Sequence, residues 1–293
     1  MSAVHHRVRR ALRATLVPAA TVLTLGAPTT DAMSQADPRL APSARAGAAG
    51  FRYDFRIETG DGEAVRGVTY VDGDRSRIEL LDDEGKRSSS YLLVTDGGRA
   101  LTAVNPEKRE YSVTSAQGFE RIIGSAMEAV DKVMTLELRD LDVTGRRLGG
   151  GGRVAGHDTE HSRLTAEYAL RVGALGFTTL QRHRVNVDYW VAPGLRLPRN
   201  PMVEMFAALP MVLAQHDRDF GTRLRAGRDA LVGTGTPLKV VIEAREEDEE
   251  GESSRSRTVI ELTAVERATH DPSLFRVPAG YHRTDGFNFS VKH

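Results

Sequence analysis

Apolar and charged residues alternate strictly where the folded part of the chain begins. From Phe51 to Ile57 every second residue is a large apolar one, and each residue between them is charged. A period of two is typical of a strand with one buried face and one face in water. Similar short runs recur at 65–71, 76–81 and 91–113, separated by turns such as Asp96-Gly97. Because Asp-Gly favours tight turns, the pattern predicts a meander of antiparallel strands.

Two stretches have helical spacing instead. Thr114 stands in the N-cap position with Gln117 three residues on, and apolar residues at helical spacing continue to Val130. Asn200-Pro201 predicts the start of a second helix, which Pro210 kinks or divides. This second helix is rich in large apolar residues: Met202, Met205, Phe206, Leu209 and Met211.

Strand patterns resume between and after the helices. They cover 134–148, 154–172, 179–191, 238–244 and 257–265. The run Gly149–Gly152 is expected to be a flexible hinge or hairpin tip, and the acidic run Glu246–Glu252 a solvated hairpin tip. The order predicts the α+β class: one antiparallel sheet interrupted by helical insertions. We expect a single domain over 51–293, with a helical insertion near 200–226.

The N-terminus has the features of an export signal. Four arginines precede an apolar segment from Ala14 to Gly26, which is too short to span a bilayer. Small residues follow, and we expect cleavage near Ala36; the alternative is an anchored N-terminal helix. Residues 37–50 are Ala, Pro, Ser and Gly-rich, so we expect a flexible leader. The mature protein is expected to be soluble and periplasmic or secreted.

Composition excludes several classes of function. The chain has no cysteine, so disulfides, thiolate metal sites, cysteine nucleophiles and an N-terminal lipid anchor are excluded. Removing residues 1–36 leaves 36 basic and 39 acidic residues, a net charge of −3. This balance argues against nucleic acid as a partner.

The chain offers little for catalysis. His157 and His161 could meet on one face of a strand, but no third ligand is visible nearby, and ordinary strand residues are the alternative to a metal site. No Gly-x-Ser-x-Gly motif occurs. The pair Asp72 and Asp74 has the composition of a turn. We therefore expect no enzyme, no metal and no cofactor.

The candidates for ligand binding are apolar. The helix with Met202, Met205, Phe206, Leu209 and Met211 presents a soft, adaptable surface that could line or plug a lipid cavity. The alternative is a core helix that fills the sheet. Trp190, the single tryptophan, could stack on a ligand, or else pack in the core or at its rim.

Several turn-and-strand signatures together resemble a bacterial family of exported domains related to the LolA/LolB-like periplasmic lipoprotein carriers. The segments that carry the resemblance are Phe51–Ile57, Gly67–Val71, Asp74–Glu79, Asp96-Gly97, Asn105–Tyr111, Gly156-His157, Tyr189–Pro193 and Phe275–Tyr281. The resemblance covers about residues 50–282. It implies an incomplete, strongly curved β-barrel with helices across its concave face, a fold that in the carriers holds acyl chains. No carrier-specific functional residue matches.

Two functions are consistent with these features. The first is a non-enzymatic binding or carrier protein for an apolar ligand, either a lipid or an acylated protein. The second is an envelope sensor or scaffold that binds a protein partner through a sheet edge or the helical insertion, without a ligand cavity.

Overall fold

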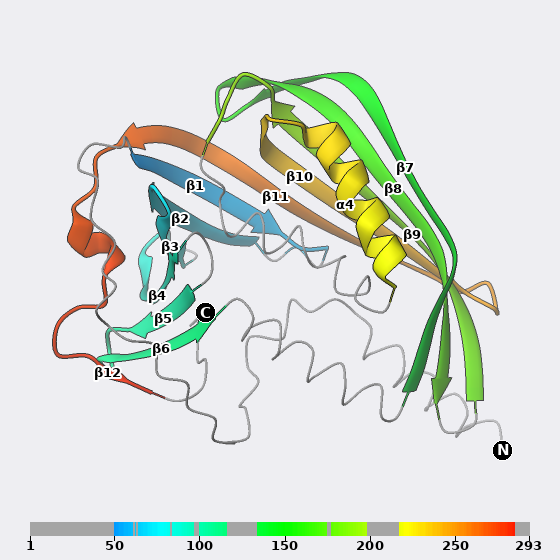
Figure 1. The fold of residues 1–293 in the computed structure, drawn as a ribbon, viewed down its shortest axis with the longest axis horizontal. Coiled ribbons are helices and arrows are strands. Elements are labelled where there is room, and N and C mark those ends of the chain that lie inside the picture. The colour runs from blue at the N-terminus through cyan, green and yellow to red at the C-terminus, as the bar shows by residue number, and fades with distance from the viewer. Residues whose placement is uncertain are drawn as a thin grey trace.

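The computed structural model describes residues 50–60, 62, 64–82, 84–96, 100–115, 134–174, 177–197 and 217–284. Twelve strands in these ranges form one sheet, accompanied by a single α-helix and a short 3-10 helix (Figure 1). The strand order is β12-β6-β5-β4-β3-β2-β1-β11-β10-β9-β8-β7. The sheet is strongly curved and open, with β12 and β7 at its two edges.

The sheet has two halves of different strand length. The N-terminal half-sheet has short strands: β1 (Gly50–Glu58), β2 (Ala64–Asp72), β3 (Arg75–Leu81), β4 (Arg87–Thr95), β5 (Ala100–Asn105) and β6 (Glu110–Ser115). The C-terminal half-sheet has longer ones: β7 (Met134–Val154), β8 (His157–Ala174), β9 (Phe177–Ala192), β10 (Thr236–Asp248) and β11 (Ser253–Ala268). β1 pairs with β11 and joins the halves. All pairs are antiparallel except that of β12 (His282–Arg283) with β6.

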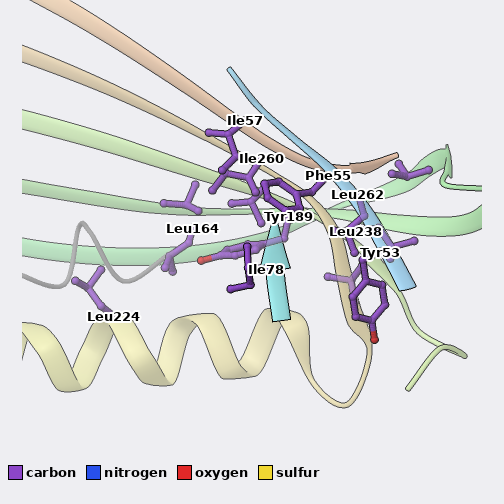
Figure 2. Close-up of a cluster of buried hydrophobic side chains, with 14 of the residues drawn as sticks. Tyr53, Phe55, Ile57, Ile78, Leu164, Tyr189, Leu224, Leu238, Ile260 and Leu262 are labelled. Atoms are coloured by element: carbon purple, nitrogen blue, oxygen red, sulfur yellow. The ribbon is translucent and has the colours of Figure 1, made fainter. Parts of the chain in front are cut away.

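The concave face of the sheet carries the main core. Tyr53, Phe55 and Ile57 of β1 point to this face, as the alternating sequence predicts. Their neighbours in the core come from both halves and from the helix α4 (Arg218–Val232), for example Ile78, Leu164 and Leu224 (Figure 2). The curvature thus brings two sets of strands and one helix around a single apolar interior.

The N-terminal half-sheet is covered on its convex face as well. Phe275, in the 3-10 helix η5 (Pro272–Phe275), packs on Val68 and Tyr70 of β2. Farther along, Val277 and Tyr281 pack against Tyr91, Leu93 and Val104. The backbone N–H of His282 and of Thr284 donate to the carbonyls of Arg109 and Tyr111. The C-terminal segment, residues 271–284, therefore seals this face.

The predicted strands agree with the observed ones in position, but two local expectations are wrong. The run Gly149–Gly152 is not a hairpin tip, because it lies inside β7; the turn comes later, at Ala155-Gly156. Thr114 lies in strand β6 rather than at a helix N-cap. The remainder of the predicted first helix lies outside the described residues.

The expected helices on the concave face are represented by α4. It overlaps the end of the predicted insertion near 200–226 and extends beyond it. No helix within the described ranges is long and apolar enough to cross a membrane.

Candidate functional site

Helix α4 lies on the concave face of the C-terminal half-sheet, over β7 and β8 (Figure 1). The side chain of Asp217 accepts a hydrogen bond from the backbone N–H of Phe220 at 2.9 Å and so caps the helix. Phe220, Leu224, Leu231 and Val232 pack against the core of the sheet, at helical spacings. Most other α4 side chains are exposed. The helix therefore holds to the sheet through a narrow apolar stripe.

Glycines bring α4 close to the strands. A Cβ atom on Gly227 would lie 2.7 Å from Cδ1 of Leu164, and one on Gly145 of β7 would lie 3.4 Å from Leu231. A side chain at position 227 would press on Leu164, whereas a Cβ at position 145 would be in ordinary van der Waals contact with Leu231. The close approach compensates for the small number of apolar residues on α4.

Polar side chains interrupt the apolar concave face beneath the first turn of α4. The ring of Tyr168 of β8 stacks on that of His183 of β9, with centroids 4.9 Å apart, and Phe220 meets Tyr168 edge-on at 5.4 Å. Gln181 lies two residues from His183 on the same face and is 5% exposed. Burial lowers the pKa of His183 to about 4 and raises the pKa of Tyr168 to about 12. Both rings are therefore uncharged at neutral pH.

A pocket of about 300 Å³ lies where β7, β8, β9 and β10 bend together. It adjoins Tyr168 and His183, but most of its lining is charged. Arg184 pairs with Glu167 at 3.2 Å, and Arg245 with Glu247 at 3.3 Å. The full lining is Asp140, Glu167, Tyr168, Ala169, Arg182, His183, Arg184, Arg245 and Glu247.

Trp190 lies on the opposite, convex face of the C-terminal half-sheet. Its neighbours in β9, Tyr189 and Val191, point into the core, so Trp190 points away from α4. The ring of His161 stacks on it at 4.3 Å, and Nζ of Lys239 lies 5.5 Å from its ring centroid. Trp190 thus sits between an imidazole and an ammonium group at the rim of the core.

A buried carboxylate supports this convex cluster. Asp188, whose side chain is 3% exposed, accepts hydrogen bonds from Nε of Arg163 at 3.0 and 3.1 Å. Its Oδ1 also lies 2.7 Å from Nε2 of His161. His161 is therefore occupied by Asp188 and Trp190. In the described ranges no three His, Asp or Glu side chains gather as a metal site.

The glycine run of β7 has a packing role that its sequence did not reveal. A Cβ atom on Gly151 would lie 2.6 Å from Oγ1 of Thr159 and 2.7 Å from Cδ1 of Trp190. Gly149 and Gly152 adopt positive φ angles of 106° and 72° beside two register shifts of the strand. The run lets a bulged strand pass close to Trp190.

Of the predicted ligand-binding residues the structure describes Trp190, and the call on the others stays a prediction. Met202, Met205, Phe206, Leu209 and Met211 lie outside the described residues, and Trp190 lies on the convex face. The sequence predicted a helical insertion near 200–226 but not the bounds of α4, because its apolar stripe of Phe220, Leu224, Leu231 and Val232 is narrow. The signal that could have found it is Asp217 as N-cap, Phe220, Leu224 and Leu231 at helical spacing, and Gly233 as the stop.

Comparison with known proteins finds similarity among solved structures. No family model and no curated protein matches the chain. Among solved structures, the chain is similar to the crystal structure of a LolA superfamily protein from Nitrosomonas europaea. The two sequences are 10% identical, the TM-score is 0.26, and the match covers 78% of this chain and 90% of that one. A similarity at this level assigns neither family nor function.

Proposed function

We propose that the protein is a non-enzymatic binding or carrier protein for an apolar ligand, either a lipid or an acylated protein. The observation that carries the proposal is the apolar concave face, which runs through both half-sheets and which α4 contacts mainly at β7 and β8. The ligand replaces the apolar side chains of α4 as the group that packs against the strands.

The energies of this exchange are of the same size. Burying one Phe or Leu side chain contributes about 1.5–3 kcal/mol. The buried Phe220 and Leu224, with the partly buried Leu231 and Val232, therefore contribute roughly 5–9 kcal/mol. An acyl chain gains about 0.8 kcal/mol for each buried CH₂, or roughly 8 kcal/mol for ten of them. Displacing the stripe by a chain is therefore close to balanced, as reversible carriage requires.

The absence of an enzymatic role is part of the proposal. Its support is the lack of a nucleophile motif in the sequence and the use of His161 in a stack on Trp190 and a contact with Asp188.

We also propose export, with cleavage near Ala36. N-terminal sequencing of secreted material should then begin at or near Asp37, and recovery of intact Met1 in the membrane fraction would contradict this.

Uptake of the neutral fluorophore N-phenyl-1-naphthylamine by the purified mature protein tests carriage. We expect saturable binding, and displacement by long-chain compounds. Ala166→Phe adds bulk on the concave face of β8 and should weaken binding, whereas Thr165→Phe adds the same bulk on the convex face and should leave binding unchanged. No binding to the unmodified protein, or equal effects of both substitutions, would contradict the proposal.

The unpaired edge of β7 supports the scaffold role as a second candidate. In the described part of the chain this 21-residue strand pairs only with β8, and Leu148 on it is 44% exposed. An open edge can accept a strand from a partner. A photo-crosslinker at position 148 should then capture one stoichiometric envelope protein, whereas the same group at Thr165 should not.

A further inference from the structure

Two buried polar atoms on the concave face have no partner among the described residues. They are Oε1 of Gln181 and Nε2 of His183. Both residues belong to β9 and share the concave face with Val185 and Val187. Burying a polar group without a hydrogen bond costs about 1–3 kcal/mol, so two such atoms side by side on one strand indicate a missing partner.

The two atoms belong to one small cluster. Tyr168 pairs with His183 in the sheet register and stacks on its ring, while Leu170 pairs with Gln181. Phe220 of α4 closes over Tyr168. A group that reaches Gln181 and His183 therefore lies at the end of the apolar face, beneath the first turn of α4.

The surrounding charges restrict what this group can be. On the adjacent strand β10, Glu246 pairs with His183 and Asp248 pairs with Gln181, so both carboxylates are strand neighbours on the same face. Glu246 also contributes to the raised pKa of Tyr168. The basic residues of β9 nearby, Arg182 and Arg184, lie on the opposite face. An anionic group would be repelled here, whereas the oxygen of Gln181 requires a hydrogen-bond donor.

We propose that Gln181, His183 and Tyr168 bind the polar head of the apolar ligand, and that this head is an uncharged hydrogen-bond donor such as a hydroxyl or an amide N–H. The inference rests on the proposed function. It places the head group at the end of the concave face beneath the first turn of α4. It also excludes free fatty acid anions as the preferred ligand.

Displacement of N-phenyl-1-naphthylamine by two probes of equal chain length, 1-dodecanol and dodecanoate, tests the inference. We expect 1-dodecanol to displace the fluorophore at an approximately tenfold lower concentration than dodecanoate, the effect of about one hydrogen bond. Gln181→Leu combined with His183→Phe should remove this preference and still bind the fluorophore. Arg171→Gln, on the convex face of β8, is the matched control and should keep the preference.

The single variant Gln181→Leu covers the case in which the double variant does not fold. It replaces an unpartnered polar atom by an apolar group, so it should be at least as stable as the unmodified protein while it loses the preference. Equal displacement by the two probes, a preference for dodecanoate, or a preference that survives in Gln181→Leu would overturn the inference and leave carriage intact. Failure of the unmodified protein to bind the fluorophore would overturn both.

Discussion

The two half-sheets bury their side chains in different ways. In the N-terminal half-sheet, β2 and β4 each contain five consecutive buried residues, Gly67–Val71 and Ser90–Val94. In the C-terminal half-sheet, β8 alternates between buried and partly exposed positions from Ser162 to Tyr168. Among the described residues, the first pattern comes from covers on both faces, and the second from a cover on one face.

The covers differ in strength as well. Residues 271–284 anchor the convex face of the N-terminal half-sheet with Phe275, Val277, Tyr281 and backbone hydrogen bonds to the strand region. Helix α4 contacts the concave face of the C-terminal half-sheet with four apolar side chains, of which Leu231 and Val232 are only partly buried. The comparison supports the proposal in which the N-terminal half-sheet is the fixed frame and α4 is the cover that a ligand displaces.

The largest expected effect comes from placing a charge on the convex face of each half. Leu93→Asp puts a carboxylate beneath the C-terminal segment, at a side chain that is 2% exposed, and should lower the free energy of unfolding by about 4 kcal/mol or more. Thr165→Asp, on the convex face of β8, should cost about 1 kcal/mol, through the lost hydrogen bond to Asn186. Urea unfolding of both variants measures this. Equal losses would refute the difference between the half-sheets.

The next effect is a pH dependence located in the C-terminal half-sheet. Burial lowers the pKa of His183 from 6.5 to about 4, so between these values the unfolded chain binds a proton that the folded chain does not. The stabilisation is fully present above pH 6.5 and is lost as the pH falls toward 4, by up to about 3 kcal/mol. His183→Phe keeps a ring against Tyr168 and should flatten this decline. Urea unfolding at pH 7 and pH 4.5 tests it, and parallel declines in both proteins would show that His183 is not responsible.

A smaller effect concerns the convex face beside Trp190. Gly151→Ala would bring a methyl group against Thr159 and Trp190, and should lower the free energy of unfolding by about 1–3 kcal/mol. It should also shift the emission of the single tryptophan. Gly150→Ala has no heavy atom within 4 Å of the added Cβ and should change stability by less than about 0.5 kcal/mol. Indistinguishable spectra and stabilities would contradict the close passage of β7.

The strands could be predicted from the sequence because their cause is local. The alternation from Phe51 to Ile57 and the turn at Gly156 are properties of neighbouring residues. The glycine run could not be assigned correctly, because the reason for Gly151 is a contact with Trp190, about forty residues away in the chain. A run of glycines has the same local signature in a hinge and in a bulged strand.

The candidate site was harder to predict for the same reason. Gln181 and His183 look like ordinary polar residues of a strand, and only the sheet register and α4 show that they are buried on the concave face. Trp190 is a reasonable candidate by residue type. Because side chains alternate along β9, however, it lies on the convex face. The sequence shows which residues are polar. Which face of the sheet each of them occupies depends on pairing between strands that are distant in the chain.

The most direct test of the exchangeable cover is to lock α4 to the sheet. Because the natural chain has no cysteine, Leu164→Cys with Gly227→Cys creates one pair of thiols, at positions already in contact. We expect the oxidised protein to take up little N-phenyl-1-naphthylamine, and reduction with dithiothreitol to restore uptake in the same sample. Equal uptake by the oxidised and reduced protein would show that the ligand does not displace α4.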